Sequence, residues 1–140
     1  MEEGRIVPFS STDVEMNAAI AKARASLPTF WASYDSHKAS ESGHSLKVRF
    51  ALPDNSVEHI WIVDVKKLTD GSYSGRFANT PDQLVGCIGD VTEFNEADIS
   101  DWLFLRNGKI VGGETIRVLL KDLPKEDADA FRARLERPYN

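Results

Sequence analysis

Hydrophobic positions along the chain change their period near Ser45, and the two periods predict different elements. The first set has the spacing of one face of an α-helix: Met16, Ile20, Ala23 and Leu27. We expect a helix over residues 12–27, preceded by a loose tail over residues 1–11. Pro28 follows, and because a residue before proline disfavours the helical conformation, a second short helix should begin there. Residues 37–43 are polar and are expected to form a linker.

From Ser45 onward the period is two, which is typical of half-buried β-strands. Strands are predicted over 45–52 and 57–67, with the turn Pro53-Asp54-Asn55-Ser56 between them. Closing the hairpin on these four turn residues gives a set of pairs: Leu52 with Val57, Phe50 with His59, Val48 with Trp61 and Leu46 with Val63. This register places His59 and Trp61 on the core-facing side of the sheet.

The second half of the chain mixes strand and helix signals. Thr69-Asp70-Gly71 suits a three-residue hairpin loop, so a third strand is predicted over 72–78, with Phe77 opposite Val63. A short fourth strand is expected over 89–94, and Asn107-Gly108 should join two further strands. Helical spacing returns in two sets: Ile116, Leu119, Leu120 and Leu123, and, after Pro124, Ala128, Phe131 and Leu135.

These elements predict an α+β fold. We expect a mostly antiparallel sheet of about five to six strands, a meander plus a hairpin, with N-terminal and C-terminal helices packed on it. The chain has 140 residues, of which 41% are hydrophobic, so one ordinary core over residues 12–137 is the expected domain organisation.

Charge and cysteine content narrow the class of protein. The 22 acidic residues exceed the 17 basic ones, so nucleic acid and an anionic membrane are not expected as partners. The acidic start of the chain lacks the apolar run of a signal peptide, and no stretch is long enough to span a membrane, which favours the cytoplasm. The single cysteine, Cys87, lies in an apolar segment and is expected to be buried.

No metal site, cofactor site or catalytic residue is predicted. His37, His44 and His59 have neither cysteine partners nor the spacing of a zinc motif. The glycines match neither a dinucleotide-binding nor a phosphate-binding loop, and there is no nucleophile motif of the G-x-S-x-G type.

His59 and Asp101 have two open interpretations each. His59 is either a neutral buried imidazole or a polar group at the floor of a pocket, within reach of Asp101. Ser100 and Asp101 either hold a loop through backbone hydrogen bonds or line the rim of a cleft. Arg117 is either solvated or paired with Asp101.

Three further side chains near these have simpler expectations. Trp61 and Trp102 are expected in the core rather than as platforms for a ligand. Glu58 should be a solvated partner for Lys47 or Arg49 on the opposite face.

Short segments along the chain match a known family in order and rough spacing: Phe30-Trp31, Ser45-Leu46-Lys47-Val48, Glu58-His59-Ile60-Trp61, Gly75 with Asn79-Thr80-Pro81, Ile99-Ser100-Asp101-Trp102, and Thr115-Ile116-Arg117-Val118-Leu119-Leu120. Together they resemble the YegJ-like family of small bacterial domains of unknown function. The resemblance covers residues 28–122 and leaves the N-terminal and C-terminal helices outside. It implies a compact bacterial domain of the intracellular type and supplies no catalytic residues.

The functional expectation is a non-catalytic binding or regulatory module that recognises a protein or a small ligand. An immunity-type protein is one form of it, because acidic charge would suit a basic toxin. The ligand would lie in the cleft between the meander and residues 100–117. The candidate ligand-binding residues are His59, Trp61, Asn79, Ser100, Asp101, Trp102 and Arg117. The alternative is a small hydrolase-type enzyme that uses His59 and Asp101.

Overall fold

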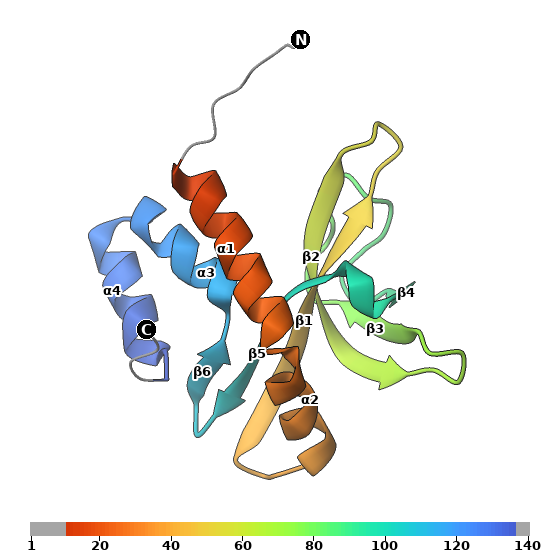
Figure 1. Ribbon diagram of the computed structural model, residues 1–140, viewed down its shortest axis with the longest axis horizontal. Helices are drawn as coiled ribbons and strands as arrows, with labels where there is room; N and C mark the ends of the chain where they lie inside the picture. The colour runs from red at the N-terminus through yellow and green to blue at the C-terminus, as the bar shows by residue number, and fades with distance from the viewer. Residues whose placement is uncertain (1–10, 137–140) are drawn as a thin grey trace.

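The computed structural model describes residues 11–136, which form an antiparallel sheet of six strands with helices packed on it (Figure 1). This confirms the α+β fold. The predicted tail lies outside the described residues, apart from Ser11, which begins the first helix. The elements in chain order are α1 (Ser11–Ala25), α2 (Leu27–Ser36), β1 (Glu41–Ala51), β2 (Val57–Lys67), β3 (Tyr73–Phe77), β4 (Val91–Phe94), η1 (Glu96–Asp98), β5 (Ile99–Arg106), β6 (Lys109–Gly112), α3 (Glu114–Leu119), η2 (Leu120–Asp122) and α4 (Lys125–Arg134).

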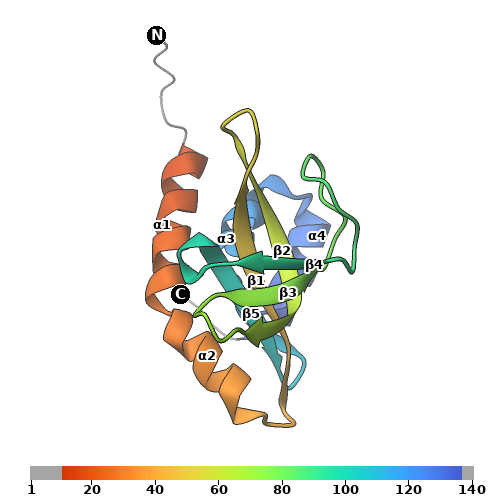
Figure 2. The ribbon, with the colours of Figure 1, turned by 90° about the vertical axis from the view of Figure 1, so that its right-hand side faces the viewer.

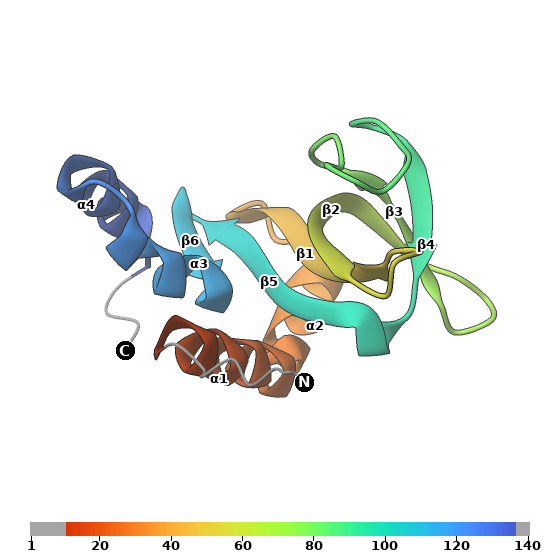
Figure 3. The same cartoon turned by 90° about the horizontal axis from the view of Figure 1, so that it is seen from above.

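The strands follow the order β4-β3-β2-β1-β5-β6 across the sheet. Seen from above, the sheet curls between β6 and β4, and α4 lies beyond β6 at the end far from β4 (Figure 3). Helices α1 and α2 follow one another along one side of the sheet (Figure 2). The core fills the space between these helices and the sheet, with Ala23, Leu27 and Phe30 packed on the buried side chains of the strands.

The register of the first hairpin differs from the prediction by one residue. Arg49 pairs with His59 and Lys47 with Trp61, so His59 and Trp61 lie on the face away from α1 and α2. The cause is the turn. Asn55 adopts a left-handed conformation with φ 70°, and the Leu52 amide bonds to the Ser56 carbonyl at 2.9 Å. The loop therefore closes on three residues, and a slip of one residue reverses the face of every side chain that follows.

We call this second face the outer face; it carries Lys47, Arg49, His59 and Trp61. The inner face carries the buried residues Leu46, Val48, Ile60 and Ile62. The prediction that His59 faces the core is therefore wrong, and His59 is exposed.

The pairing of β1 with β2 ends at Leu46 and Ile62, and the two strands diverge from there. β1 continues to Glu41 beside β5, inside the segment that was expected to be a linker, and β2 continues to Lys67 beside β3. Asp64 has a left-handed φ of 54° within an irregularity between Val63 and Lys66. We call the gap between the two strands the fork.

The second hairpin also has a register different from the prediction. Phe77 pairs with Ile62 instead of Val63. The corrected pair places Phe77 on the inner face, where both Phe77 and its partner Ile62 are buried.

A bulge in β5 decides which of its residues enter the core. Val48 pairs with Ile99 and Lys47 with Asp101, so Ser100 is an extra residue in this strand. As a result Ile99 and Trp102 are both buried in the core, while Ser100 and Asp101 both belong to the outer face. Without the bulge, residues 99 and 102 would lie on opposite faces.

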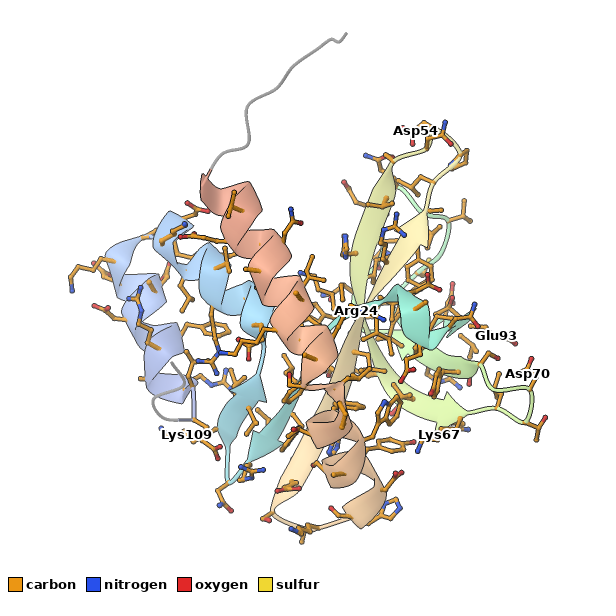
Figure 4. All side chains as sticks on the ribbon, viewed as in Figure 1. Arg24, Asp54, Lys67, Asp70, Glu93 and Lys109 are labelled. Carbon is orange, nitrogen blue, oxygen red and sulfur yellow. The ribbon has the colours of Figure 1, made fainter. Side chains whose placement is uncertain are left out.

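Polar side chains attach the helices to this bulged strand. The indole Nε1 of Trp102, which is 1% exposed, donates to the Ala23 carbonyl at 3.0 Å and to Ser26 Oγ at 3.2 Å. Arg24, near the end of α1, donates to the Ile99 carbonyl at 2.7 Å and to the carbonyls of η1 (Figure 4). The junction of α1 and α2 is thereby fixed against the start of β5.

The C-terminal helices bury fewer residues than predicted. α3 ends at Leu119 and the chain continues as η2, which breaks the helical spacing, so Leu119 and Leu123 are each 42% exposed while Leu120 is buried. In α4 Ala128 is buried as expected. Leu135 follows the end of α4 and forms a parallel bridge with Ile110 of β6.

Glu58 was expected to be a partner for Lys47 or Arg49. Its carboxylate instead binds the backbone of the segment over residues 79–90. Its carboxylate accepts the amides of Asp82, Gln83 and Leu84 at 2.5, 3.0 and 2.9 Å. These bonds lower the pKa of Glu58. The same segment carries Cys87, which is exposed, so the expectation of a buried cysteine is wrong. The segment forms neither a strand nor a helix, and Val85 and Ile88 on either side of Cys87 are exposed as well, while Leu84 packs against the core.

We expect Glu58→Gln to loosen residues 79–90. The Gln amide can keep one acceptor oxygen toward the Gln83 and Leu84 amides, which share Oε1, but it then turns its NH₂ group toward the Asp82 amide, so hydrogen exchange at Asp82 should become several-fold faster. In the parent protein the pKa of Glu58 is lower in the folded state than in the unfolded state. Protection should therefore persist above the unfolded pKa and be lost as the pH falls through the folded pKa. Glu93→Gln, at an exposed position of β4, is the matched control, and equal exchange in both variants would contradict this role of Glu58.

Candidate functional site

The predicted site residues are divided among the two faces of the sheet, one loop and helix α3. His59, Trp61, Ser100 and Asp101 share the outer face, whereas Trp102 lies in the core on the other side of the sheet. Asn79 is exposed in the segment after β3, and Arg117 lies on α3. The structure therefore brings four of the seven residues to one face.

Asp101 is fully buried and surrounded by hydrogen-bond donors. Its Oδ1 accepts the amides of Trp102 at 2.8 Å and Glu114 at 3.1 Å, and its Oδ2 accepts the amide and hydroxyl of Thr115 at 2.8 and 2.6 Å. Burial raises the pKa of Asp101, and these hydrogen bonds oppose the rise. The carboxylate caps the first turn of α3, which is an arrangement that holds a loop, as the first interpretation predicted.

Gly112 and Gly113 allow this cap to form. Gly112 has φ 85°, and a Cβ on it would lie 2.5 Å from the Trp102 carbonyl oxygen. The Gly113 amide donates to that same carbonyl at 2.7 Å. Only a residue without a side chain can approach β5 so closely, and the approach brings the start of α3 onto Asp101.

The side chain of Arg117 also stabilises this turn, by a hydrogen bond to a backbone carbonyl. Its Nε donates to the Gly112 carbonyl at 3.1 Å, and the side chain is half-buried. The four donors to Asp101 described above come from the backbone and from Thr115.

His59 contacts Ser100 rather than Asp101. Its Nδ1 lies 3.0 Å from Ser100 Oγ, and that hydroxyl is also 3.3 Å from the Lys47 carbonyl. Burial lowers the pKa of His59, and the charges of Lys47 and Arg49 lower it further. Because Asp101 is enclosed by its own donors, it cannot act as a base or orient the His59 ring. The structure therefore does not form the His59–Asp101 pair on which the hydrolase interpretation rested.

Lys47 crosses the outer face toward α3. Its Nζ donates to Thr115 Oγ1 at 3.1 Å and lies 5.9 Å from the centre of the Trp61 ring. Burial lowers the pKa of Lys47, while the charge of Asp101 raises it.

The fork opens into a pocket of about 620 Å³, which we call the fork pocket. Its lining residues come from both separated strands, from α2 and from the two strands beyond β2: Tyr34, Gly43, His44, Val63, Asp64, Val65, Lys66, Ser74, Gly75, Arg76 and Val91. Tyr34 donates its hydroxyl to the Val65 carbonyl. Volumes of roughly 300–1,000 Å³ are usual for small-molecule sites.

His44 is the most constrained polar side chain of this pocket. Its Nε2 lies 2.8 Å from Ser33 Oγ, which donates to Glu41 Oε1 at 2.7 Å. Arg106 bonds the other oxygen of Glu41 at 2.9 Å. The imidazole stacks on Phe104 with ring centres 5.2 Å apart. Burial lowers the pKa of His44, against the raising effect of Glu41.

These contacts determine where the imidazole carries its proton. The Ser33 hydroxyl has one hydrogen, which it donates to the carboxylate of Glu41, because a carboxylate can only accept. Ser33 Oγ is then an acceptor toward His44, so the neutral ring has its proton on Nε2. Nδ1 is left as a hydrogen-bond acceptor.

Sequence reasoning did not find this site. Ser33 lies on α2, Glu41 lies in the segment over residues 37–43 that was taken for a linker, and His44 directly follows that segment. Their contacts arise because β1 has a bulge at Gly43, where φ is 66°. A lone glycine in a polar stretch was the one available signal, and it fits an ordinary loop equally well.

Two general features are absent from residues 11–136. No group of three or more His, Cys, Asp or Glu residues in this range could hold a metal ion. None of the helices there is long and apolar enough to cross a membrane.

Comparisons with known proteins place the chain in a family. A family described as "Uncharacterized protein conserved in bacteria (DUF2314)" matches residues 13–136, and the chain belongs to this family. The matched range includes both α1 and α4, which the resemblance had left outside.

The chain is also similar to the uncharacterized protein YegJ of Escherichia coli K12, with 41% identity over 81 residues. The alignment covers 57% of this chain and 52% of YegJ, so the chain spans about half the length of that relative. This confirms the YegJ-like resemblance. No solved structure matched the chain.

We expect Asp101→Asn to lower the free energy of unfolding by roughly 1–3 kcal/mol, because the new amide would turn its NH₂ group toward two of the buried donors. Chemical denaturation measures this change. Asp82→Asn, at an exposed position, is the control and should change stability by less than about 0.5 kcal/mol. An Asp101→Asn variant within a few tenths of a kcal/mol of the parent would show that the cap of α3 does not depend on the carboxylate.

Proposed function

We propose that the domain is a non-catalytic binding module whose ligand enters the fork pocket. The observation that carries this proposal is the Glu41–Ser33–His44 array beside a pocket of about 620 Å³. Buried polar groups that are held in one geometry next to a pocket are typical of sites that recognise a ligand.

The lining indicates what such a ligand offers. Within residues 11–136 no group hydrogen-bonds to His44 Nδ1, so a donor group of a ligand, such as a hydroxyl or an amide, suits this atom. Lys66, Arg76 and Asp64 bring charges of both signs to the pocket wall, and Val63 and Val91 add apolar surface. A small polar molecule with both donor and acceptor groups fits this set.

The same geometry argues against hydrolytic chemistry at the array. A serine beside a histidine is the arrangement of a nucleophile and its base. Here Ser33 is only 6% exposed and donates its proton to Glu41, not to the imidazole. Its oxygen is therefore neither activated nor reachable by a substrate. With His59 separated from Asp101 as well, binding is the function that the contacts support best.

A ligand screen tests the proposal. A collection of amino acids, nucleosides, sugars and dipeptides would be screened by thermal shift, and each hit followed by amide NMR. We expect a hit to move the signals of Gly43, Asp64 and Gly75. In His44→Phe, which keeps the ring stacked on Phe104, the affinity for that hit should fall roughly tenfold, as for the loss of one hydrogen bond.

The control is His59→Phe, which removes the other imidazole of the sheet but leaves the fork pocket intact. It should bind the hit as the parent does. A hit whose affinity depends on His59 and not on His44, or whose NMR changes lie away from the fork, would overturn the proposal.

A further inference from the structure

A second cluster on the outer face lies outside the fork pocket. Lys47 and Arg49 of β1 face Trp61 and His59 of β2 in consecutive pairs, and Ser100 of β5 contacts His59 at 3.0 Å. Arg49 and His59 are exposed and Trp61 is half-buried. Three strands thus bring two cations, an imidazole and an indole to one surface.

The local charge of this cluster is opposite to that of the protein. The chain has a net charge of −5, but both charges that act on His59 are cationic, and both lower its pKa. The acid of the neighbouring strand, Asp101, is buried and shielded by its four donors. The exposed groups of the cluster therefore favour an anion.

We propose that the Lys47–Arg49–His59–Trp61 cluster binds a carboxylate-rich, extended segment of a partner protein. The planar guanidinium of Arg49 can bind a carboxylate through two parallel hydrogen bonds. Trp61 provides apolar surface for the aliphatic part of the segment. This goes beyond the fork pocket, since it concerns different residues and a different class of ligand.

The observations favour a protein segment over single-stranded nucleic acid. Nucleic-acid sites of this kind use a series of aromatic side chains on which successive bases stack. The cluster has one indole, and the ammonium of Lys47 already lies 5.9 Å from its centre.

Binding should depend on pH through His59. The groups around its imidazole are Lys47 and Arg49 of β1, and Ser100 and the buried Asp101 of β5. A bound carboxylate favours the charged imidazolium, so affinity should rise as the pH falls through the pKa of His59.

The test uses a fluorescein-labelled octapeptide of four Glu-Ser repeats, with fluorescence anisotropy as the readout. We expect binding that weakens in high salt and several-fold weaker binding in Arg49→Ala. The matched control is Arg132→Ala on α4, which removes the same charge far from the cluster and should bind as the parent does. His44→Phe should also bind the peptide unchanged, which keeps this test separate from that of the fork pocket.

Four results would overturn the proposal. The peptide fails to bind at millimolar concentration, or a Gln-Ser peptide of the same length binds equally well, or Arg132→Ala weakens binding as much as Arg49→Ala. Tighter binding of an eight-residue thymidine oligonucleotide than of the Glu-Ser peptide would also overturn it, in favour of nucleic acid.

Discussion

The carboxylate of Asp101 is the interaction on which the arrangement of the outer face depends. It is buried, and four donors from β5 and the start of α3 meet it. The bulge at Ser100 puts it on the outer face, and the close approach of Gly112 brings α3 to it. The same bulge lets Ile99 and Trp102 enter the core together. Burial of a charge is costly and raises the pKa of Asp101, and the four hydrogen bonds offset part of this cost.

Much of this fold follows from hydrophobic period and turn chemistry. The alternation after Ser45 and the Asn107-Gly108 turn correctly predicted strands, and Pro28 correctly marked a new helix. The register did not follow, because it depends on one backbone conformation. Asn55 in the left-handed region shortens the loop by one residue, and this moves His59 and Trp61 to the outer face. Pattern alone could not distinguish a three-residue loop from a four-residue one.

The Ser100–Asp101 segment and the fork pocket also differ in how far the sequence predicts them. Ser100 and Asp101 stood out in the sequence because a hydroxyl and a carboxylate at a strand start tend to bond to nearby backbone, and Asp101 does so. Ser33, Glu41 and His44 gave no such signal, since their contacts join a helix to a bulged strand. Residues tied to the local backbone are visible in sequence, whereas a pocket made by two diverging strands is a property of the whole sheet. The Asp101 cap thus has a structural role, whereas the fork pocket has the proposed binding role.

The proposed ligand site depends most directly on the protonation of one imidazole. Because Ser33 donates to Glu41, His44 should carry its proton on Nε2 and present Nδ1 as an acceptor. Nitrogen-15 NMR of the histidine rings distinguishes the two tautomers and the charged form. At pH 7 and without ligand, we expect His44 to be neutral with its proton on Nε2. A ring protonated on Nδ1, or a charged ring at that pH, would contradict the arrangement of the pocket floor.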